Sequence, residues 1–249
     1  MSTDTQIIGI DCATQPKKVG LAFGRFDGGT VTITEAVTEQ THDLITDRVA
    51  GWVTQAPRTL IALDAPLGWP VDLSKALAGH QAGDTLDVPA NNLFRRATDR
   101  FIADKVGKTP LDVGADRIAR TAHAALALLN RLRHATQLPI PLAWDSDFDE
   151  SVAAIEVYPA ATLKVWGAPS SGYKRSDQRP ERKSILQGLQ PQMDTSAVQE
   201  AVLGNADILD SAVCVLAGRD FLEGWAFKPS DQIAARTEGW IWVVDKERC

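Results

Sequence analysis

Five acidic residues stand in segments that are otherwise apolar, and acids in such positions carry chemistry when several of them meet. Asp11 and Asp64 each close an apolar run, QIIGID and TLIALD. Glu156 lies inside VAAIEVY, and Asp207 and Asp210 interrupt NADILDSAVCVLAG. Because an unpaired carboxylate is costly to bury, each of these acids needs a counter-charge, a capping role or a bound cation.

The two aspartates of the late apolar segment raise the sharpest question. Asp207 and Asp210 are three residues apart, so in a helix they share one face, where like charges repel. Hard cations such as Mg²⁺ bind carboxylate oxygens. Two divalent ions can activate water and stabilise the leaving oxygen in phosphodiester cleavage. Since bound metal would remove the repulsion, the pair favours a Mg²⁺ or Mn²⁺ site.

Each acid taken alone also has a simpler explanation. An aspartate at the end of a strand often caps a turn. Asp207, two residues after Asn205, could be a first-turn acid that the helix dipole favours. Glu156 could pair with a buried arginine. These alternatives stay open at the level of the sequence.

The elements that must position these acids follow from hydrophobic periodicity. Apolar and alternating runs predict strands at 6–11, 18–26, 31–37, 59–64, 152–158 and 238–244, the first three as an antiparallel meander. Helical periodicity appears over 42–55, 116–134, 179–190 and from about 205 onward. We therefore expect an α/β protein with a mixed sheet flanked by helices, in which the carboxyl ends of the strands face the ligand.

The domain organisation is expected to be simple. No Pro/Gly/Ser-rich linker separates two cores, so residues 1–249 are predicted to form a single domain. Residues 71–140 look mostly helical and lie between the fourth and fifth predicted strands. They are interpreted as a helical insertion subdomain within that domain.

Composition excludes several classes of protein. The chain has 249 residues, 44% hydrophobic and 23% charged, which is typical of a globular protein. Its net charge of −6 argues against a protein that coats nucleic acid nonspecifically. No run approaches about 18 consecutive apolar residues, so no membrane partner is expected. The polar start MSTDTQ and three cysteines without CxxC spacing favour the cytoplasm.

Several stretches carry a resemblance to known proteins. They are IGIDCATQPKKVGLA, IALDAPLGWP, FRRATD, IEVYPAATLK, DILDSAVCVLAG and EGWIWV. The order of a strand with aspartate, a meander, a helix, a second strand with aspartate, helices and a late DxxD helix resembles the ribonuclease H-like fold, especially its Holliday-junction resolvase branch. More closely, the chain resembles the family called "domain of unknown function 429", whose members are predicted ribonuclease H-like nucleases.

This resemblance implies roles for all five acids. Asp11, Asp64, Asp207 and Asp210 would be the metal ligands of a nuclease that uses Mg²⁺ or Mn²⁺. Glu156 would be an additional ligand or a group that handles a proton. Five acids exceed the minimum for such a site, so one of them could lie behind the ligands.

A first basic segment, FRRATDR, is a candidate for contact with a nucleic-acid substrate. Its arginines Arg95 and Arg96 could grip phosphates across the mouth of the site. The alternative is a surface helix in which these arginines form ion pairs with Asp99.

A second basic segment, residues 164–183, follows the strand that carries Glu156. It contains Lys164, Lys174 and Arg175 together with Ser and Gly residues typical of a loop. These side chains could bind phosphates, and Tyr173 could stack on a base or sugar. A solvated run of charge is the alternative.

Two other functions are compatible with the same pattern. Actin-like kinases and ATPases share the core fold, and GIDCAT is similar to their first phosphate loop, with Asp11 and Thr14. That architecture needs two duplicated domains, and Ala65 stands where a glycine is expected. The other alternative is a non-catalytic binding protein, although it would keep costly buried acids for no purpose. DNA against RNA stays open, and so does a homodimer, which resolvase-like enzymes often form.

Overall fold

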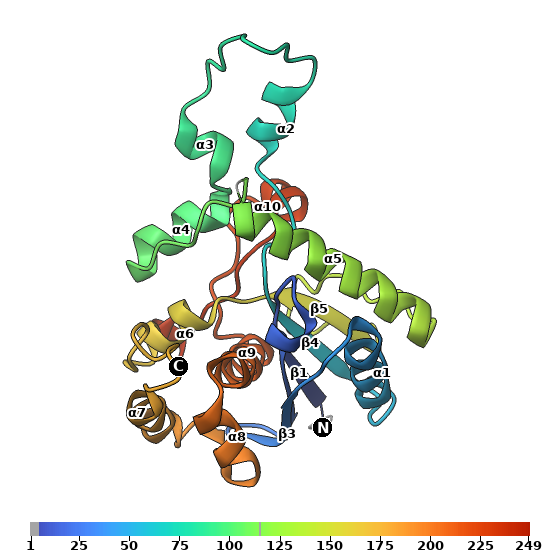
Figure 1. The fold of residues 1–249 in the computed structure, drawn as a ribbon, viewed down its shortest axis with the longest axis vertical. Helices are drawn as coiled ribbons and strands as arrows, with labels where there is room; N and C mark the ends of the chain where they lie inside the picture. The colour runs from blue at the N-terminus through green and yellow to red at the C-terminus, as the bar shows by residue number, and fades with distance from the viewer. Residues whose placement is uncertain (1–4, 115) are drawn as a thin grey trace.

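A six-stranded mixed sheet forms the centre of the structure (Figure 1). The computed structural model describes residues 5–114 and 116–249. In the order β5–β4–β1–β2–β3–β6, β1, β2 and β3 form an antiparallel meander, β4 and β5 run parallel to β1, and β6 runs parallel to β3. The strands are β1 (Thr5–Asp11), β2 (Gly20–Phe26), β3 (Val31–Thr38), β4 (Thr59–Asp64), β5 (Val152–Glu156) and β6 (Met193–Asp194). The predicted mixed α/β architecture is confirmed.

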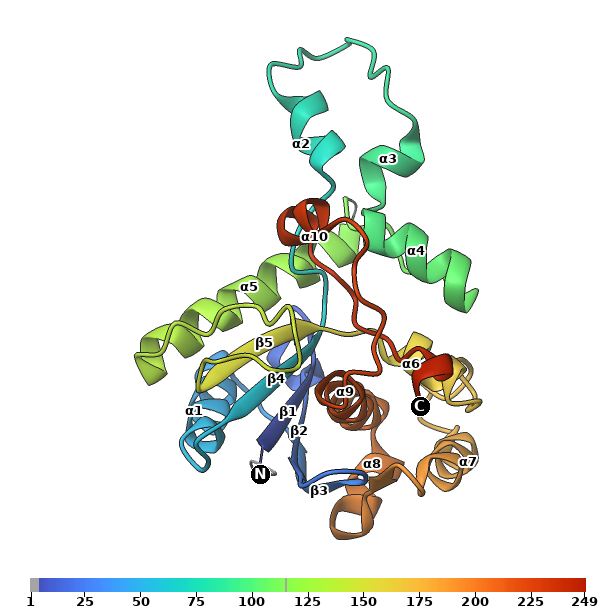
Figure 2. The same cartoon turned by 180° about the vertical axis from the view of Figure 1, so that it is seen from behind.

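Helices cover both faces of this sheet, as Figures 1 and 2 show from opposite sides. α1 (His42–Val53) and α5 (Asp116–Thr136) share a core with Ile8 and Ile10 of β1. α9 (Ala206–Leu222) covers the other face, where Ile7 contributes to its core. The helices that accompany α9 are α6 (Pro159–Val165), α7 (Arg179–Leu189) and α8 (Gln199–Gly204). No helix in the described part of the chain combines the length and apolar character that crossing a bilayer requires.

α9 lies unusually close to the sheet because two glycines leave room for its backbone. A Cβ atom at Gly9 would lie 2.0 Å from the carbonyl oxygen of Ser211. One at Gly20 would lie 1.9 Å from the carbonyl oxygen of Asp207. Asn205 caps the helix by accepting a 2.8 Å hydrogen bond from the Asp207 backbone N–H. The first turns of α9 are therefore held against the ends of β1 and β2.

The segment between β4 and β5 contains four helices, which are α2 (Val71–Leu77), α3 (Ala90–Phe94), α4 (Ala97–Val106) and α5. α2, α3 and the loop between them project from the body of the molecule (Figures 1 and 2). Residues 78–89 form no helix, although the sequence predicts mostly helix there. Gly79 and Gly83 adopt positive φ, and Pro89 offers no backbone donor, so the chain turns instead.

The predicted strand at 238–244 is wrong. Glu238 ends α10 (Gln232–Glu238), and the following residues meet β5 only through a single bridge between Glu156 and Ile241. The same edge of β5 bridges Leu142 at Ala154, so neither neighbour can extend along this short strand. The strand predicted at 152–158 ends at Glu156, because Pro159 begins α6. The two-residue β6 was not predicted.

Candidate active site

Asp11 and Asp64 lie side by side at the carboxyl ends of two parallel strands. They are register partners in the β1–β4 ladder. Both face α9, because side chains alternate along a strand and Ile7 and Leu60 point to the α9 side. The pairing that the two apolar runs predict therefore places two carboxylates together on one face of the sheet.

Asp210 is fully buried on α9 and faces a tyrosine and a lysine. The Tyr173 hydroxyl donates a 2.7 Å hydrogen bond to Asp210 Oδ1. The Lys174 ammonium lies 2.6 Å from Oδ2, yet it makes no well-directed hydrogen bond to that oxygen. Lys174 keeps 62% of its side chain exposed, so its charge reaches Asp210 from the solvent side.

The pKa values of Asp11, Asp64 and Asp210 indicate that the three carboxylates repel one another. Burial raises the pKa of Asp64 to about 7, with a further contribution from Asp210. Burial, then Asp210 and Asp64, raise the pKa of Asp11 well above its usual range. Burial also raises the pKa of Asp210, although Lys174 and Tyr173 oppose the shift. Asp11, Asp64 and Asp210 therefore form a carboxylate cluster, and the positive charge near them does not balance the negative charge of three carboxylates.

Asp207, one turn before Asp210, lies at the rim of this cluster. Its side chain is 24% exposed, and its carboxylate lies 3.6 Å from the ammonium of Lys18. Its charge adds to the repulsion at Asp11 and Asp210. Asp207 and Asp210 therefore have different environments: Asp210 is buried in the cluster, and Asp207 is partly solvated beside it.

Glu156 lies in a second, separate arrangement with Arg96. Arg96 donates to both carboxylate oxygens of Glu156, at 2.6 and 2.8 Å, and also to Asp99 at 2.9 Å. Leu67 adds a 3.0 Å backbone hydrogen bond to Glu156. All three charged side chains are buried. The simpler explanation, that Glu156 pairs with a buried arginine, is what the structure shows, and we call this group the Arg96 network.

The Arg96 network engages two residues for which the sequence predicted roles in the site. The guanidinium of Arg96 donates to Glu156, Asp99 and the Glu238 carbonyl, although Arg96 and Glu156 both line the same pocket as Asp64. The carboxylate of Glu156 accepts a hydrogen bond from the Leu67 N–H, three residues after Asp64. The neighbouring acids raise the pKa of Arg96 despite its burial, so its guanidinium stays charged, whereas burial raises the pKa of Glu156 against the opposing effect of Arg96.

A pocket of about 480 Å³ opens in front of the cluster. Asp11, Asp64 and Lys174 line one side of it, and Leu111 and Ile118 contribute an apolar wall. Asp210 is not part of the lining, because Tyr173 and Lys174 stand between it and the pocket. Sequence reasoning missed this apolar wall, since nothing in the local pattern links it to the acids.

The pocket also contains polar groups that the sequence did not single out. They come from the loop after α4, from the link between β5 and α6, and from the loop before α7, and are Lys108, Tyr158, Ser170 and Ser171. Burial, then the charge of Asp64, raise the pKa of Tyr158 to about 12, so this hydroxyl remains a donor. In the sequence, Tyr158 could have been recognised as a pocket residue from its position two residues after Glu156.

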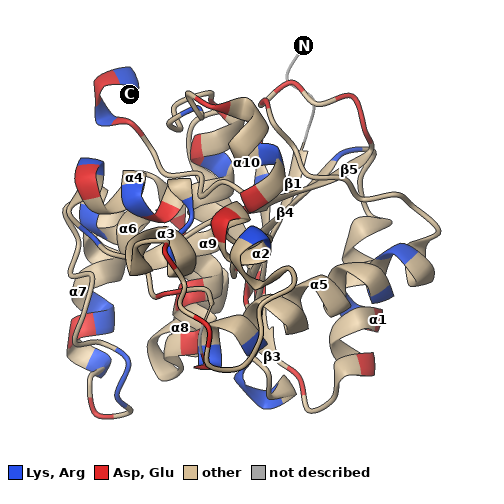
Figure 3. Ribbon diagram, turned by 90° about the horizontal axis from the view of Figure 1, so that it is seen from above, with Lys and Arg blue, Asp and Glu red and all other residues tan. Residues whose placement is uncertain are grey.

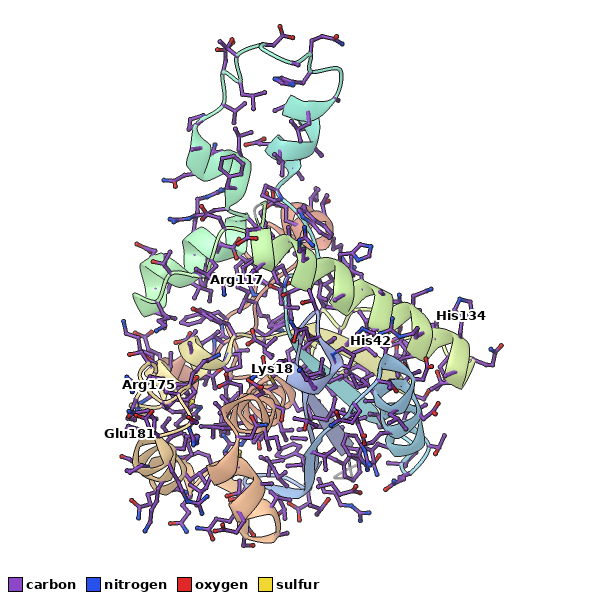
Figure 4. All side chains as sticks on the ribbon, in the orientation of Figure 1. Lys18, His42, Arg117, His134, Arg175 and Glu181 are labelled. Carbon is purple, nitrogen blue, oxygen red and sulfur yellow. The ribbon has the colours of Figure 1, made fainter. Side chains whose placement is uncertain are left out.

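The other predicted substrate contacts lie outside this pocket. Arg95 pairs with Asp112 at 2.7 Å, and Lys164 donates to the Gly107 carbonyl at 2.6 Å. Arg175 is exposed and pairs with Asp177 at 2.7 Å, at the side of the molecule opposite His134 in Figure 4. Of the five predicted basic contacts, Arg96 and Lys174 line the pocket, and the guanidinium of Arg96 is paired there with Glu156 and Asp99. Tyr173 is buried against Asp210, so its ring cannot stack on a base.

The cluster fits a divalent cation in donor type and in charge. Within residues 5–114 and 116–249, no three Asp, Glu, His or Cys side chains lie in an arrangement that could hold a metal ion as they stand. The donors are nevertheless carboxylates, which hard cations prefer, and Asp210 Oδ2 is buried without a directed hydrogen bond. Because Lys174 lies where a cation would meet Asp210, a metal ion would have to displace it.

Comparison with known proteins identifies the family of this chain. The protein belongs to the class of mixed α/β proteins. Its carboxylates lie at the ends of two parallel strands and on the helix above them. Residues 9–233 match the family described as "Protein of unknown function (DUF429)", and the chain belongs to this family. No curated protein matches the sequence.

Proposed function

We propose that this protein is a metal-dependent nuclease of the ribonuclease H-like type, which hydrolyses phosphodiester bonds in the pocket in front of Asp11 and Asp64. The observation that carries the proposal is the carboxylate cluster. Three acids from β1, β4 and α9 repel one another at one edge of the sheet, with Lys174 as the cation beside them. Retaining such a cluster without a ligand would cost stability.

The order of elements supports the same proposal. The elements follow one another in the same order as in the resemblance described above. This order is the strand with Asp11, the meander, α1, the strand with Asp64, the intervening helices and the late helix with Asp210. The six-stranded mixed sheet is compatible with a ribonuclease H-like fold.

In the proposed reaction Asp11, Asp64 and Asp210 hold Mg²⁺ or Mn²⁺, with Asp207 at the rim. When bound, the metal supplies positive charge for the attacking and leaving oxygens of a phosphodiester. Lys174, released from Asp210, binds a phosphate oxygen of the substrate. The Arg96 network holds the chain after Asp64 in place, and Leu111 and Ile118 accommodate the base or sugar and exclude water.

The test is metal-dependent cleavage by the full chain. After treatment with EDTA, the protein is assayed with Mn²⁺ or Mg²⁺ on labelled single-stranded, duplex and branched DNA and RNA, and on bis(4-nitrophenyl) phosphate. We expect hydrolysis that needs the metal, and a loss of more than about 100-fold in Asp64→Asn. Even residues behind metal ligands contribute 10–100-fold, and a ligand should contribute more.

The matched control is Asp87→Asn, the same change at an exposed aspartate in the loop after α2, which should retain full activity. Thermal unfolding separates the alternatives, because a ligand of the folded state stabilises it. Stabilisation by Mn²⁺ that is lost in Asp64→Asn supports the metal site. Stabilisation by ATP without nucleic-acid cleavage would favour the actin-like alternative, and no response to either would favour a non-catalytic protein.

A further inference from the structure

A second hollow of about 560 Å³ lies beside the pocket, against α1 and α5. We call it the α5 groove. Its polar lining consists of Thr14, His42, Arg120, His123 and Arg131, and alanines of α5 form the rest. The lining includes two arginines and two histidines and no carboxylate, in a chain whose net charge is −6. Such a local excess of positive charge is a signature of a binding site for anions.

The arginines of this groove are available to a ligand. α5 carries four arginines and a single acidic residue, Asp116, and Figure 3 marks these basic positions in blue along the helix. Within the described residues no ion pair or side-chain hydrogen bond engages Arg120. Arg131 makes one hydrogen bond, 3.3 Å to the Thr46 hydroxyl, and no ion pair. This contrasts with Arg95, Arg96 and Arg175, which are each paired with an acid.

The groove adjoins the pocket across the first turns of α5. Ile118 and Thr121 line the pocket, whereas Arg120 and His123 line the groove. The loop after β1 connects them in the same way, since Cys12 lines the pocket and Thr14 the groove. Figure 4 shows Arg117 and His134 at the two ends of α5, with His42 beneath the helix. A polymer that leaves the pocket over α5 therefore enters a surface of positive charge.

We propose that the α5 groove binds the phosphate backbone of a nucleic acid whose scissile phosphate lies in the pocket. The choice of nucleic acid as the ligand rests on the proposed nuclease function. Arg120 and Arg131 lie on one face of α5, three turns or about 16 Å apart. That distance corresponds to a few phosphate spacings along one strand of a nucleic acid. Arginine suits this role, because its planar guanidinium binds phosphate through two hydrogen bonds.

The experiment measures binding and does not depend on catalysis. We compare nucleic-acid binding by the Asp64→Asn variant with binding by the same variant carrying Arg120→Ala and Arg131→Ala. Binding is measured by fluorescence anisotropy with a labelled 20-base-pair duplex and the matching single strand, in EDTA, between 50 and 200 mM salt. Each lost phosphate contact should lower the log–log salt slope by about 0.7–0.9. For both arginines the Kd should rise roughly 30-fold at 0.1 M salt. Arg120→Ala alone covers the case in which loss of the Arg131–Thr46 contact disturbs folding.

The control removes the same charge elsewhere. Arg179→Ala with Lys183→Ala, both exposed on α7, should leave the slope unchanged. Equal slopes in the groove variant and this control would overturn the groove assignment, as would poly-glutamate that binds as tightly as the duplex through the same arginines. A lower slope in the groove variant, together with a wild-type protein that hydrolyses no phosphodiester, would instead reject the nuclease function and retain the groove.

Discussion

Two groups of buried acids lie near the same edge of the sheet, and their surroundings are opposite. In the Arg96 network, Glu156 and Asp99 share a buried guanidinium through short, paired hydrogen bonds. In the carboxylate cluster, Asp11, Asp64 and Asp210 have the ammonium of Lys174, which reaches them from a mostly exposed side chain. One group is neutralised from within the protein, and the other is not.

The difference separates a structural role from a functional one. A buried charge that is fully paired fixes the chain around it, and breaking the pair is costly. Under the proposed function, the acids that remain incompletely neutralised are retained because they bind a ligand, although burial raises the pKa of Glu156 in the paired group as well. Residue type alone does not distinguish Glu156 from Asp11, Asp64 and Asp210, because all four end or interrupt apolar segments.

The largest expected effect is loss of the Arg96 network. Arg96→Met leaves Glu156 and Asp99 buried without a counter-charge, and should lower the free energy of unfolding by about 3–5 kcal/mol. Denaturant unfolding measures it. Arg95→Met, next in sequence but partly exposed, should change the same quantity by less than about 1 kcal/mol. Equal effects of the two substitutions would show that the network does not hold the fold.

The cluster should respond in the opposite direction. Asp64 has a pKa of about 7 in the folded protein and about 3.9 in an unfolded chain. It therefore takes up a proton on folding between those values, and in EDTA the free energy of unfolding should fall as the pH rises from about 4 to about 7. Asp64→Asn removes this titration, so the variant should be more stable than the wild type at pH 8, by about 2–4 kcal/mol.

Asp87→Asn serves as the control for this pH series, and its curve should follow that of the wild type. Saturating Mn²⁺ should cancel the decline in the wild type, because the metal replaces the proton. A wild-type curve that rises between pH 4 and 7 in EDTA would mean that Asp64 is paired in the folded protein and is not part of an unneutralised cluster.

A smaller effect is expected from Lys174. Lys174→Met removes the cation beside Asp210, and in EDTA it should lower the free energy of unfolding by about 1 kcal/mol, since the lost partner is largely exposed. The same substitution should tighten Mn²⁺ binding in calorimetry, because the metal no longer competes with the ammonium. Arg175→Gln, the adjacent exposed residue, should change neither quantity. Weaker Mn²⁺ binding in Lys174→Met would contradict the competition.

The smallest effect is expected at Asp207. Its carboxylate is partly solvated and lies near Lys18. Asp207→Asn relieves repulsion at Asp210 but loses a favourable charge at the start of α9, so unfolding should change by no more than about 0.5 kcal/mol. Asp210→Asn should reduce Mn²⁺ affinity by much more than Asp207→Asn does. Equal losses would place both aspartates in the metal site.

The edge of the sheet could be predicted from the sequence because its signals are local. Asp11 and Asp64 end apolar runs, and two parallel strands with the same ending must bring their acids together. The pairing of Glu156 with Arg96 could not be predicted, since these residues are 60 positions apart and either could have met another partner. Lys174 was recognised as basic, but its contact with Asp210 depends on how the loop before α7 folds back.

The glycines beneath α9 limit how this protein can be altered. Positions 9 and 20 accept no larger side chain, because a single added carbon would meet the helix backbone at 2.0 and 1.9 Å. The helix that carries Asp210 can therefore not be moved closer to the pocket or away from it by larger side chains at these two positions. Another part of the pocket lining, within residues 108–111 and 170–172, belongs to loops. An engineer who wishes to enlarge the pocket or change its selectivity should diversify those loops and leave the strands untouched.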